Sequence, residues 1–364
     1  MLLRDKDYQP NEVVLCVVYY FKKPTDAIRR FEERYPHVRF IWHTVTDRLK
    51  LDCDDLIPEE DWREATIYLT FGHSPGSLAA MPNLKFIQLL SAGHDHAKKL
   101  PLFADPSIPI GTSSGVSARS IAQYAVLQIL SFAHQLPDTM NIQRSKRWVG
   151  APDWPFPRVL AGRRIGMFGY GAIARQAARI LHAMGMTIIA CTGIPRTTPE
   201  SRRHTGFLLP GSEGQGDPEG ALPVAWHSSD TREGLHAFLA DDLDVLALFA
   251  PLTEQTRHVI GREELDILGG RNPLLVNMSR GQIVVEEEMV AALKDGRLFG
   301  AALDTVDVEP LPQDSELWSL PNVAVTPHMS WAYDRYIEDC LEILAENLDR
   351  FESGKNLVNE IPRN

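Results

Sequence analysis

Three residues that could carry proton and charge chemistry, Arg280, Glu309 and His328, lie in separate stretches of the sequence. Each follows an apolar run that predicts a β-strand, and in open α/β sheets the ligand crevice lies at the carboxyl ends of the strands. A histidine can donate and accept a proton near neutral pH, and an arginine can hold a carboxylate through two parallel hydrogen bonds. Reduction of a carbonyl group beside a carboxylate needs this set of groups when a nicotinamide supplies the hydride.

Each of these residues also has a purely structural explanation. An arginine before a glycine is often a solvated turn residue, and a histidine after a proline can simply bond a backbone carbonyl. Their joint occurrence, in this order after successive predicted strands, favours catalysis over the structural explanations.

The pattern GYGAIA, from Gly169 to Ala174, lies between a predicted strand and a predicted helix. Gly169 permits a tight turn, Gly171 lets the backbone approach a pyrophosphate, and the N-terminus of the helix attracts phosphate groups. The context predicts a dinucleotide site, although a glycine-rich packing turn is the alternative. The residues expected to contact the cofactor there are Gly169, Tyr170, Gly171, Ala172 and Ile173.

The identity of the dinucleotide depends on the end of the second strand of this series. Thr192 and Gly193 stand about where NAD-binding chains often place an acidic residue for the ribose hydroxyls, and Arg196 follows. Arginine suits a phosphate group because its planar guanidinium donates two hydrogen bonds at once. The sequence therefore predicts NADP(H) as the preferred cofactor and NAD(H) as the alternative, unless these arginines are only solvated loop residues.

Strand-like and helix-like stretches alternate in two series, which predicts an α/β fold with two doubly wound parallel sheets. The helical pattern over residues 117–133 is apolar around most of its circumference, so it packs either inside the fold or in a dimer contact. Residues 197–223 are rich in glycine and proline without periodicity, which predicts a surface loop inserted in the second series. The last helical pattern, over about residues 333–351, is expected to pack on the first domain.

Composition limits the function classes. The chain has 364 residues and a net charge of -11, which disfavours nucleic acid and anionic membranes as partners. Its four cysteines are far apart, and no signal peptide or membrane span is evident, so we expect a cytoplasmic protein. The run HDH, from His94 to His96, lacks companion ligands, and we predict no metal site.

The sequence resembles the D-isomer-specific 2-hydroxyacid dehydrogenases over nearly its whole length, most closely the glyoxylate and hydroxypyruvate reductase branch. The motifs GYGAIA, PLTEQTR, NMSRGQ, EPLP, LWSLPNV and TPH occur in the order and spacing of that family. This resemblance implies a cofactor domain at residues 117–329 inserted into a substrate domain at 1–116 and 330–364, with a cleft between them. It also implies a homodimer.

The resemblance assigns a role to each motif residue. Arg280 would bind the substrate carboxylate, His328 would be the acid in reduction and the base in oxidation, and Glu309 would fix its tautomer. In the loop SAGHDH, the backbone N–H groups around Ala92 and Gly93 would receive the same carboxylate. Asp304 would meet the nicotinamide carboxamide. Further cofactor contacts are expected at Pro251, Thr256, Met278 and Ser279.

The implied activity is NADP(H)-dependent reduction of a small 2-keto acid, such as glyoxylate or hydroxypyruvate, to a D-2-hydroxy acid. A rival function from another class is a dinucleotide-sensing, corepressor-like interaction protein with residual dehydrogenase activity. Two departures from the family pattern, Gln123 and Ala172, leave the exact substrate open, and Trp331 could line either the substrate pocket or a dimer contact.

Overall fold

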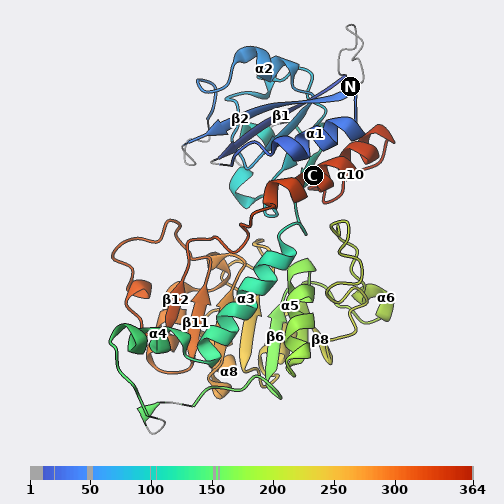
Figure 1. The fold of residues 1–364 in the computed structure, drawn as a ribbon. Helices are drawn as coiled ribbons and strands as arrows, with labels where there is room; N and C mark the ends of the chain where they lie inside the picture. The colour runs from blue at the N-terminus through green and yellow to red at the C-terminus, as the bar shows by residue number, and fades with distance from the viewer. Residues whose placement is uncertain are drawn as a thin grey trace. The chain divides into compact units, whose positions relative to one another are not determined.

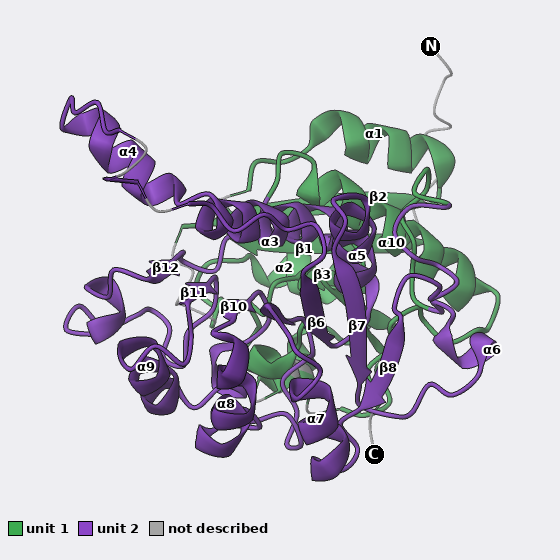
Figure 2. Ribbon diagram, turned by 90° about the horizontal axis from the view of Figure 1, so that it is seen from below, with its two compact units in different colours: residues 1–116, 206–213, 333–364 green, residues 117–205, 214–332 purple. Residues whose placement is uncertain are grey.

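The computed structural model describes residues 11–19, 21–46, 52–98, 100–103, 105–150, 153–154 and 156–362. The first ten residues, on which the signal-peptide expectation rests, lie outside the described residues. The chain divides into two compact units (Figure 2). Unit 1 comprises Met1–Val116, Gly206–Glu213 and Tyr333–Asn364, and unit 2 comprises Ser117–Thr205 and Gly214–Ala332.

Unit 1 is built on a five-stranded parallel sheet in the order β2-β1-β3-β4-β5 (Figure 1). Strand β1, which lies between β2 and β3, is buried on both faces, which explains its continuous apolar run. Its strands are Glu12–Tyr19 (β1), Val38–Val45 (β2), Ile67–Thr70 (β3), Phe86–Leu89 (β4) and Ile110–Thr112 (β5). Its α-helices are Thr25–Arg34 (α1), Glu59–Glu64 (α2) and Tyr336–Glu352 (α10).

Unit 2 is built on a seven-stranded parallel sheet in the order β12-β11-β10-β9-β6-β7-β8. Its strands are Arg164–Phe168 (β6), Thr187–Thr192 (β7), Ala225–Ser228 (β8), Val245–Leu248 (β9), Leu274–Asn277 (β10), Gly300–Leu303 (β11) and Val323–Val325 (β12). Its α-helices are Ala118–Ala133 (α3), Leu136–Arg144 (α4), Ala172–Ala183 (α5), Pro199–Arg202 (α6), Arg232–Leu239 (α7), Arg262–Leu268 (α8) and Glu286–Lys294 (α9).

The strand order of unit 2 reverses between β6 and β9, because the chain runs outward through β7 and β8 before it returns to β9. Such a switch point is where doubly wound sheets bind their ligands. The predicted α/β class with two parallel sheets is confirmed. The sequence left open whether the apolar helix α3 packs inside the fold or in a dimer contact. Ile121, Ala125 and Ile129 pack in the core of unit 2, whereas Leu127 on the other side of the helix is 50% exposed.

The segment 197–223 differs from the expected surface loop. It contains α6, whose N-cap Thr198 forms a capping box with Ser201, and Leu209, Ser212 and Asp217 are buried. Residues 206–213 group with unit 1, although the residues on both sides belong to unit 2. The glycine and proline content predicted a plain surface loop and gave no sign of this structure. Arg175 and Arg179 of α5 donate hydrogen bonds to the backbone of the segment and hold part of it in place.

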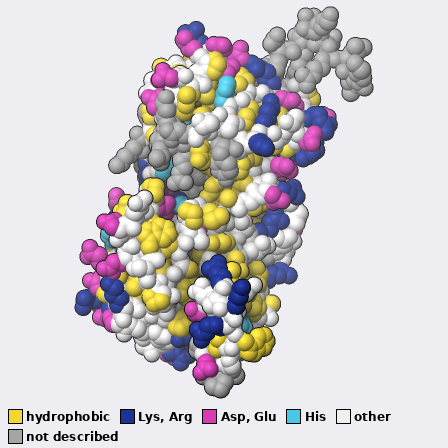
Figure 3. Space-filling view, turned by 60° about the vertical axis from the view of Figure 1, so that its left-hand side comes forward, with side chains coloured by type: hydrophobic (Ala, Val, Ile, Leu, Met, Phe, Trp, Pro, Cys, Tyr) yellow, Lys and Arg dark blue, Asp and Glu magenta, His cyan; other side chains and the backbone are white. Residues whose placement is uncertain are grey.

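Three further features concern membrane-spanning helices, the cysteines and the surface charge. Within the described residues, no helix combines the length and the apolar character that crossing a membrane requires. All four cysteines are buried and none forms a disulfide. On the face drawn in Figure 3, acidic and basic side chains are interspersed with hydrophobic ones.

Candidate active site

The turn after β6 is shaped by two glycines with different requirements. Gly169 has φ +92°, and a Cβ there would lie 2.5 Å from the backbone nitrogen of Ala250, in the loop after β9. A Cβ on Gly171 would instead meet nothing within 4 Å. The first glycine is therefore required by close packing at the switch point, and the second leaves open space in front of α5.

Helix α5 begins at that open space. Gly171 is its N-cap and supplies no side-chain hydrogen bond, and an α-helix leaves its first N–H groups without partners in the helix. These donors and the helix dipole suit a pyrophosphate, so the residues present fit a dinucleotide. The side chain of Tyr170 points away, since it is 4% exposed and its hydroxyl donates to Asp217 Oδ2 at 2.7 Å. Only the backbone of Tyr170 faces the turn.

Arginine side chains gather beyond the carboxyl end of β7. Thr192 Oγ1 donates to the carbonyl oxygen of Ile194 at 2.7 Å, and a Cβ on Gly193 would meet nothing within 4 Å. Arg196 Nη1 donates to the carbonyl oxygen of Ser201 at 2.7 Å, and Arg202 Nε donates to that of Arg196 at 3.0 Å. Both guanidinium groups thus bond the backbone of the segment that follows Thr192 and Gly193.

The loops after β9 and β10 meet at the same edge of the sheet. Thr256 Oγ1 donates to the carbonyl oxygen of Pro251 at 2.7 Å, and Ser279 Oγ donates to that of Ala250. Met278 is 5% exposed, and its N–H donates to the carbonyl oxygen of Leu248 at 3.3 Å. Four of the predicted cofactor residues thus lie in two hydrogen-bonded loops next to the glycine turn.

His328 and Glu309, which the resemblance pairs, are in hydrogen-bond contact in the structure. His328 Nδ1 and Glu309 Oε2 are 2.9 Å apart, and about a third of each side chain is exposed, 33% and 31%. Burial alone would raise the pKa of Glu309, but the hydrogen bond and charge of His328, the Val306 N–H and the charge of Arg280 lower it overall. The carboxylate is therefore ionised near neutral pH and only accepts hydrogen bonds, so the proton lies on Nδ1 and Nε2 remains for a substrate.

Arg280 is brought to this pair by a contact that the sequence prediction missed. The next residue, Gly281, packs so tightly on the loop before Glu309 that a Cβ would lie 1.9 Å from the carbonyl carbon of Val306. Arg280 itself is half-buried, and its Nη1 donates to the carbonyl oxygen of Ser279 at 2.8 Å. The only trace of this contact in the sequence is the glycine after Arg280, and a glycine alone does not indicate that two loops pack closely.

Asp304 is also in place at the carboxyl end of β11, but its carboxylate faces the chain. It is 1% exposed and accepts hydrogen bonds from Thr326, Met329 and Ser330, in the segment that carries His328.

Ala92 and Gly93 belong to unit 1 and follow β4. Ser91 Oγ donates to the carbonyl oxygen of Gly93 at 2.8 Å, which shapes this loop. His96 Nε2 lies 2.7 Å from the carbonyl oxygen of Phe71, so this member of the HDH run has a structural partner. Among the described residues, only His236, Glu263 and Glu264 could share a metal ion, and Arg232 pairs with both glutamates.

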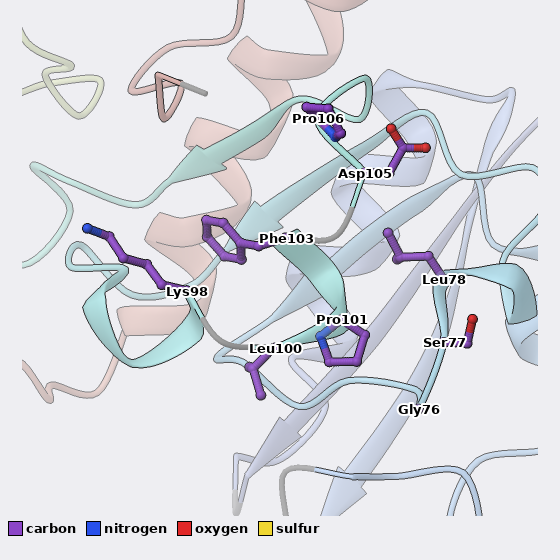
Figure 4. A pocket seen from close by; sticks show the side chains of 9 residues that line it. All are labelled: Gly76, Ser77, Leu78, Lys98, Leu100, Pro101, Phe103, Asp105 and Pro106. Carbon is purple, nitrogen blue, oxygen red and sulfur yellow. The ribbon is translucent and has the colours of Figure 1, made fainter. Parts of the chain in front are cut away.

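Unit 1 also contains a cavity of about 790 Å³ (Figure 4). Leu78, Leu100, Pro101 and Phe103 give it an apolar wall, and Lys98 and Asp105 lie at its edge. None of the predicted site residues lines it.

Comparison with known proteins identifies the class. The family "D-isomer specific 2-hydroxyacid dehydrogenase, NAD binding domain" matches residues 126–207 and 225–330. Glyoxylate/hydroxypyruvate reductase B of Erwinia tasmaniensis is 30% identical over 352 residues, which cover 94% of this chain and 98% of that protein. Hydroxypyruvate reductase of Blautia hydrogenotrophica is 26% identical over 285 residues, which cover 77% of this chain and 80% of that protein.

A solved structure agrees with these matches. The D-isomer specific 2-hydroxyacid dehydrogenase of Xanthobacter autotrophicus, crystallised with NADPH and MES, has a TM-score of 0.71 and 26% identity, and the match covers 95% of this chain and 98% of that one. The chain belongs to the D-isomer-specific 2-hydroxyacid dehydrogenase family. It is thus an NAD(P)-dependent oxidoreductase, and the resemblance found in its sequence is confirmed.

Proposed function

We propose that the protein reduces small 2-keto acids to D-2-hydroxy acids and prefers NADP(H) as the hydride donor. Glyoxylate and hydroxypyruvate are the first substrates, since two relatives that align over most of the chain carry those names. The observation that carries the proposal is the His328–Glu309 pair with Arg280, in the same unit as the dinucleotide turn.

Arg280, His328 and Glu309 each have a separate role in the proposed reaction. A bound nicotinamide supplies the hydride. Arg280 holds the substrate carboxylate. His328, with both ring nitrogens protonated, gives its Nε2 proton to the carbonyl oxygen and keeps the Nδ1 proton that bonds Glu309. Glu309 fixes the orientation of the ring through its contact with Nδ1. In the reverse direction, His328 takes the proton from the hydroxyl group.

The two units take different parts in this proposal. Unit 2 binds the dinucleotide through Gly169, Gly171 and the first turn of α5, with further contacts from the loops after β9 and β10. Unit 1 binds the substrate, and the N–H groups around Ala92 and Gly93 receive its carboxylate.

The preference for NADP(H) is supported by the charge beyond β7. Thr192 replaces the acidic residue that would accept the ribose hydroxyls and repel a phosphate, and Arg196 and Arg202 follow it in the chain. A phosphate on the ribose would gain charge-assisted hydrogen bonds there. A related dehydrogenase of Xanthobacter autotrophicus was crystallised with NADPH, which is consistent with this preference.

We also propose a homodimer. Helix α4 extends away from the other elements of unit 2 (Figure 2), and the helix and the described residues after it present large apolar side chains to solvent. These are Leu136 (43% exposed), Met140 (43%), Trp148 (100%) and Phe156 (85%). Exposed apolar groups of this size on one projecting segment are typical of an interface. Location in the cytoplasm stays a prediction.

The first test is an activity assay in which glyoxylate, hydroxypyruvate and phenylpyruvate are each offered with NADPH and with NADH, and turnover is measured as the loss of cofactor absorbance. The second test measures the size of the protein in solution with and without the cofactor. Turnover of at least one acid with higher kcat/KM for NADPH supports the proposal. Negligible turnover together with cofactor-dependent assembly would establish the sensing alternative instead. Equal or higher kcat/KM with NADH would remove the cofactor preference.

A further inference from the structure

We propose that Arg175 of α5 is a positioning residue. Its guanidinium group ties the segment that carries Arg196 and Arg202 to the glycine turn after β6, and so sets how tightly the ribose phosphate of NADPH is bound. This inference rests on the proposed preference for NADP(H). Arg175 is 7% exposed, so it acts through the groups that it bonds.

The guanidinium group of Arg175 bonds three separate parts of unit 2. Its Nε donates to the carbonyl oxygen of Tyr170, in the glycine turn, at 3.2 Å. Its Nη2 donates to the carbonyl oxygen of Arg202, at the end of α6, at 2.5 Å, and its Nη1 donates to that of Asp217. Because a guanidinium group is planar, the directions of its donors are fixed. The three backbone groups are therefore held at set positions relative to one another.

A buried charge needs compensation, because it has lost its contact with water. Burial is the largest cause that lowers the pKa of Arg175, and the charge of Arg196 lowers it further. Asp217 and Tyr170 act in the opposite direction, and Cζ of Arg175 lies over the ring of Tyr170, 4.9 Å from its centroid. The effect of Arg196 on this pKa shows that the charges of the two arginines interact.

The contacts continue from Arg202 to Arg196. Arg202 Nε donates to the carbonyl oxygen of Arg196 at 3.0 Å, and Arg196 Nη1 donates to that of Ser201 at 2.7 Å. The guanidinium group of Arg202 also lies over the ring of Trp226 in β8, with Cζ 5.5 Å from the centroid. The two arginines that the proposed function assigns to the phosphate therefore hold one another's chain in place, and Arg175 links this pair to the glycine turn.

The variant Arg175→Gln tests this link. The glutamine amide ends at about the position of Nε, so it can still donate to Tyr170 but is too short to reach Arg202. We expect the Kd for NADPH to rise about tenfold or more, since the loss of a hydrogen bond to a charged group has about this effect. The Kd for NADH should change less than about twofold, because NADH lacks the phosphate and the contact with the turn is kept.

Arg179→Gln is the matched control. Arg179 lies one turn further along the same face of α5, and it donates to the carbonyl oxygens of Gly214 and Gly216 in the same segment. It is not bonded to Arg202. R179Q should therefore change the Kd for either cofactor less than about twofold.

Two measurements separate positioning from a general structural defect. In the Arg196→Ala background, R175Q should raise the Kd for NADPH at most about threefold further, because one of the groups that it positions is absent. The second measurement is cleavage by trypsin, which cuts the peptide bond after an arginine.

The carbonyl group that Arg175 holds belongs to the peptide bond after Arg202. A Cβ on Gly220 would lie 2.5 Å from the same oxygen, so another part of the segment also packs closely on it. This carbonyl must be released before trypsin can attack it. We expect cleavage after Arg202, identified by mass spectrometry, to be at least about fivefold faster in R175Q and within about twofold of the wild-type rate in R179Q.

The inference is overturned if R175Q weakens NADPH and NADH binding equally, if R179Q has the same effects as R175Q, or if cleavage after Arg202 is not faster in R175Q. Equal affinity of the wild-type protein for the two cofactors would overturn the proposed preference instead, and cleavage would then decide the positioning role. If R175Q does not fold, Arg175→Lys replaces it, with Arg179→Lys as its control and with the same outcomes. The lysine ammonium keeps the charge, but a single nitrogen cannot bond all three carbonyl groups that surround the guanidinium group.

Discussion

Substitution of Gly281 by alanine tests whether the site depends on the close approach of two loops. The new Cβ would lie 1.9 Å from the carbonyl carbon of Val306, and contacts under 3.0 Å are essentially never found, so the loops must separate by about 1.1 Å. One loop carries Arg280 and the other leads to Glu309. A misplacement of about 1 Å can cost about 100-fold in rate. We therefore expect kcat/KM of G281A to fall about 100-fold, which corresponds to about 2.7 kcal/mol of transition-state stabilisation.

The assay is steady-state oxidation of NADPH with the best keto acid of the panel. Gly270→Ala is the control, because a Cβ there meets nothing within 4 Å and its φ is not positive. Circular dichroism and the thermal midpoint report whether G281A is folded. A folded G281A protein with kcat/KM within threefold of the wild type would refute the argument that this contact sets the distance between Arg280 and Glu309.

Three further substitutions test separate parts of the site. Glu309→Gln should lower the thermal midpoint at pH 7 but not at low pH. The pKa of Glu309 is lowered in the folded protein, so its contribution to the free energy of unfolding is complete above the ordinary pKa of about 4.3. That contribution is lost as the pH falls through the folded pKa. A difference in thermal midpoint that does not shrink as the pH is lowered below about 4.3 would contradict this. Arg196→Ala should raise the KM for NADPH about tenfold or more and the KM for NADH less than twofold, since a hydrogen bond to a charged group contributes about 1.5–3 kcal/mol; equal changes would exclude the phosphate contact. Tyr170→Phe should lower the thermal midpoint, because Asp217 loses a buried donor, and leave the Kd for NADPH within threefold; weaker binding would show that the hydroxyl contributes to the cofactor site.

Much of the fold could be predicted because the strands have apolar runs of the right length. The apolar runs that precede Arg280, Glu309 and His328 are β10, β11 and β12. Parallel strands with helices on their faces are buried on both sides, so periodicity and turn residues locate them well. The same logic places Arg280, Glu309 and His328 after strands, and it does so correctly.

The remaining features depend on contacts between residues far apart in the sequence. Asp217 looks like a loop residue in a glycine-rich stretch, yet it is buried because Tyr170 and the N–H groups of Ala221 and Leu222 bond its side chain. Asp304 carries no sequence signal for the hydrogen bonds that its carboxylate accepts from the segment 326–330.

The central claim is that His328 transfers the proton that completes hydride reduction of a 2-keto acid. The most direct measurement is kcat/KM for the preferred keto acid with NADPH, compared between the wild-type protein and His328→Ala, with the Kd for NADPH measured on both. A positioned general acid contributes about 10²- to 10⁴-fold, so the account predicts a loss of that size with an unchanged Kd. A value of kcat/KM within threefold of the wild type would contradict it.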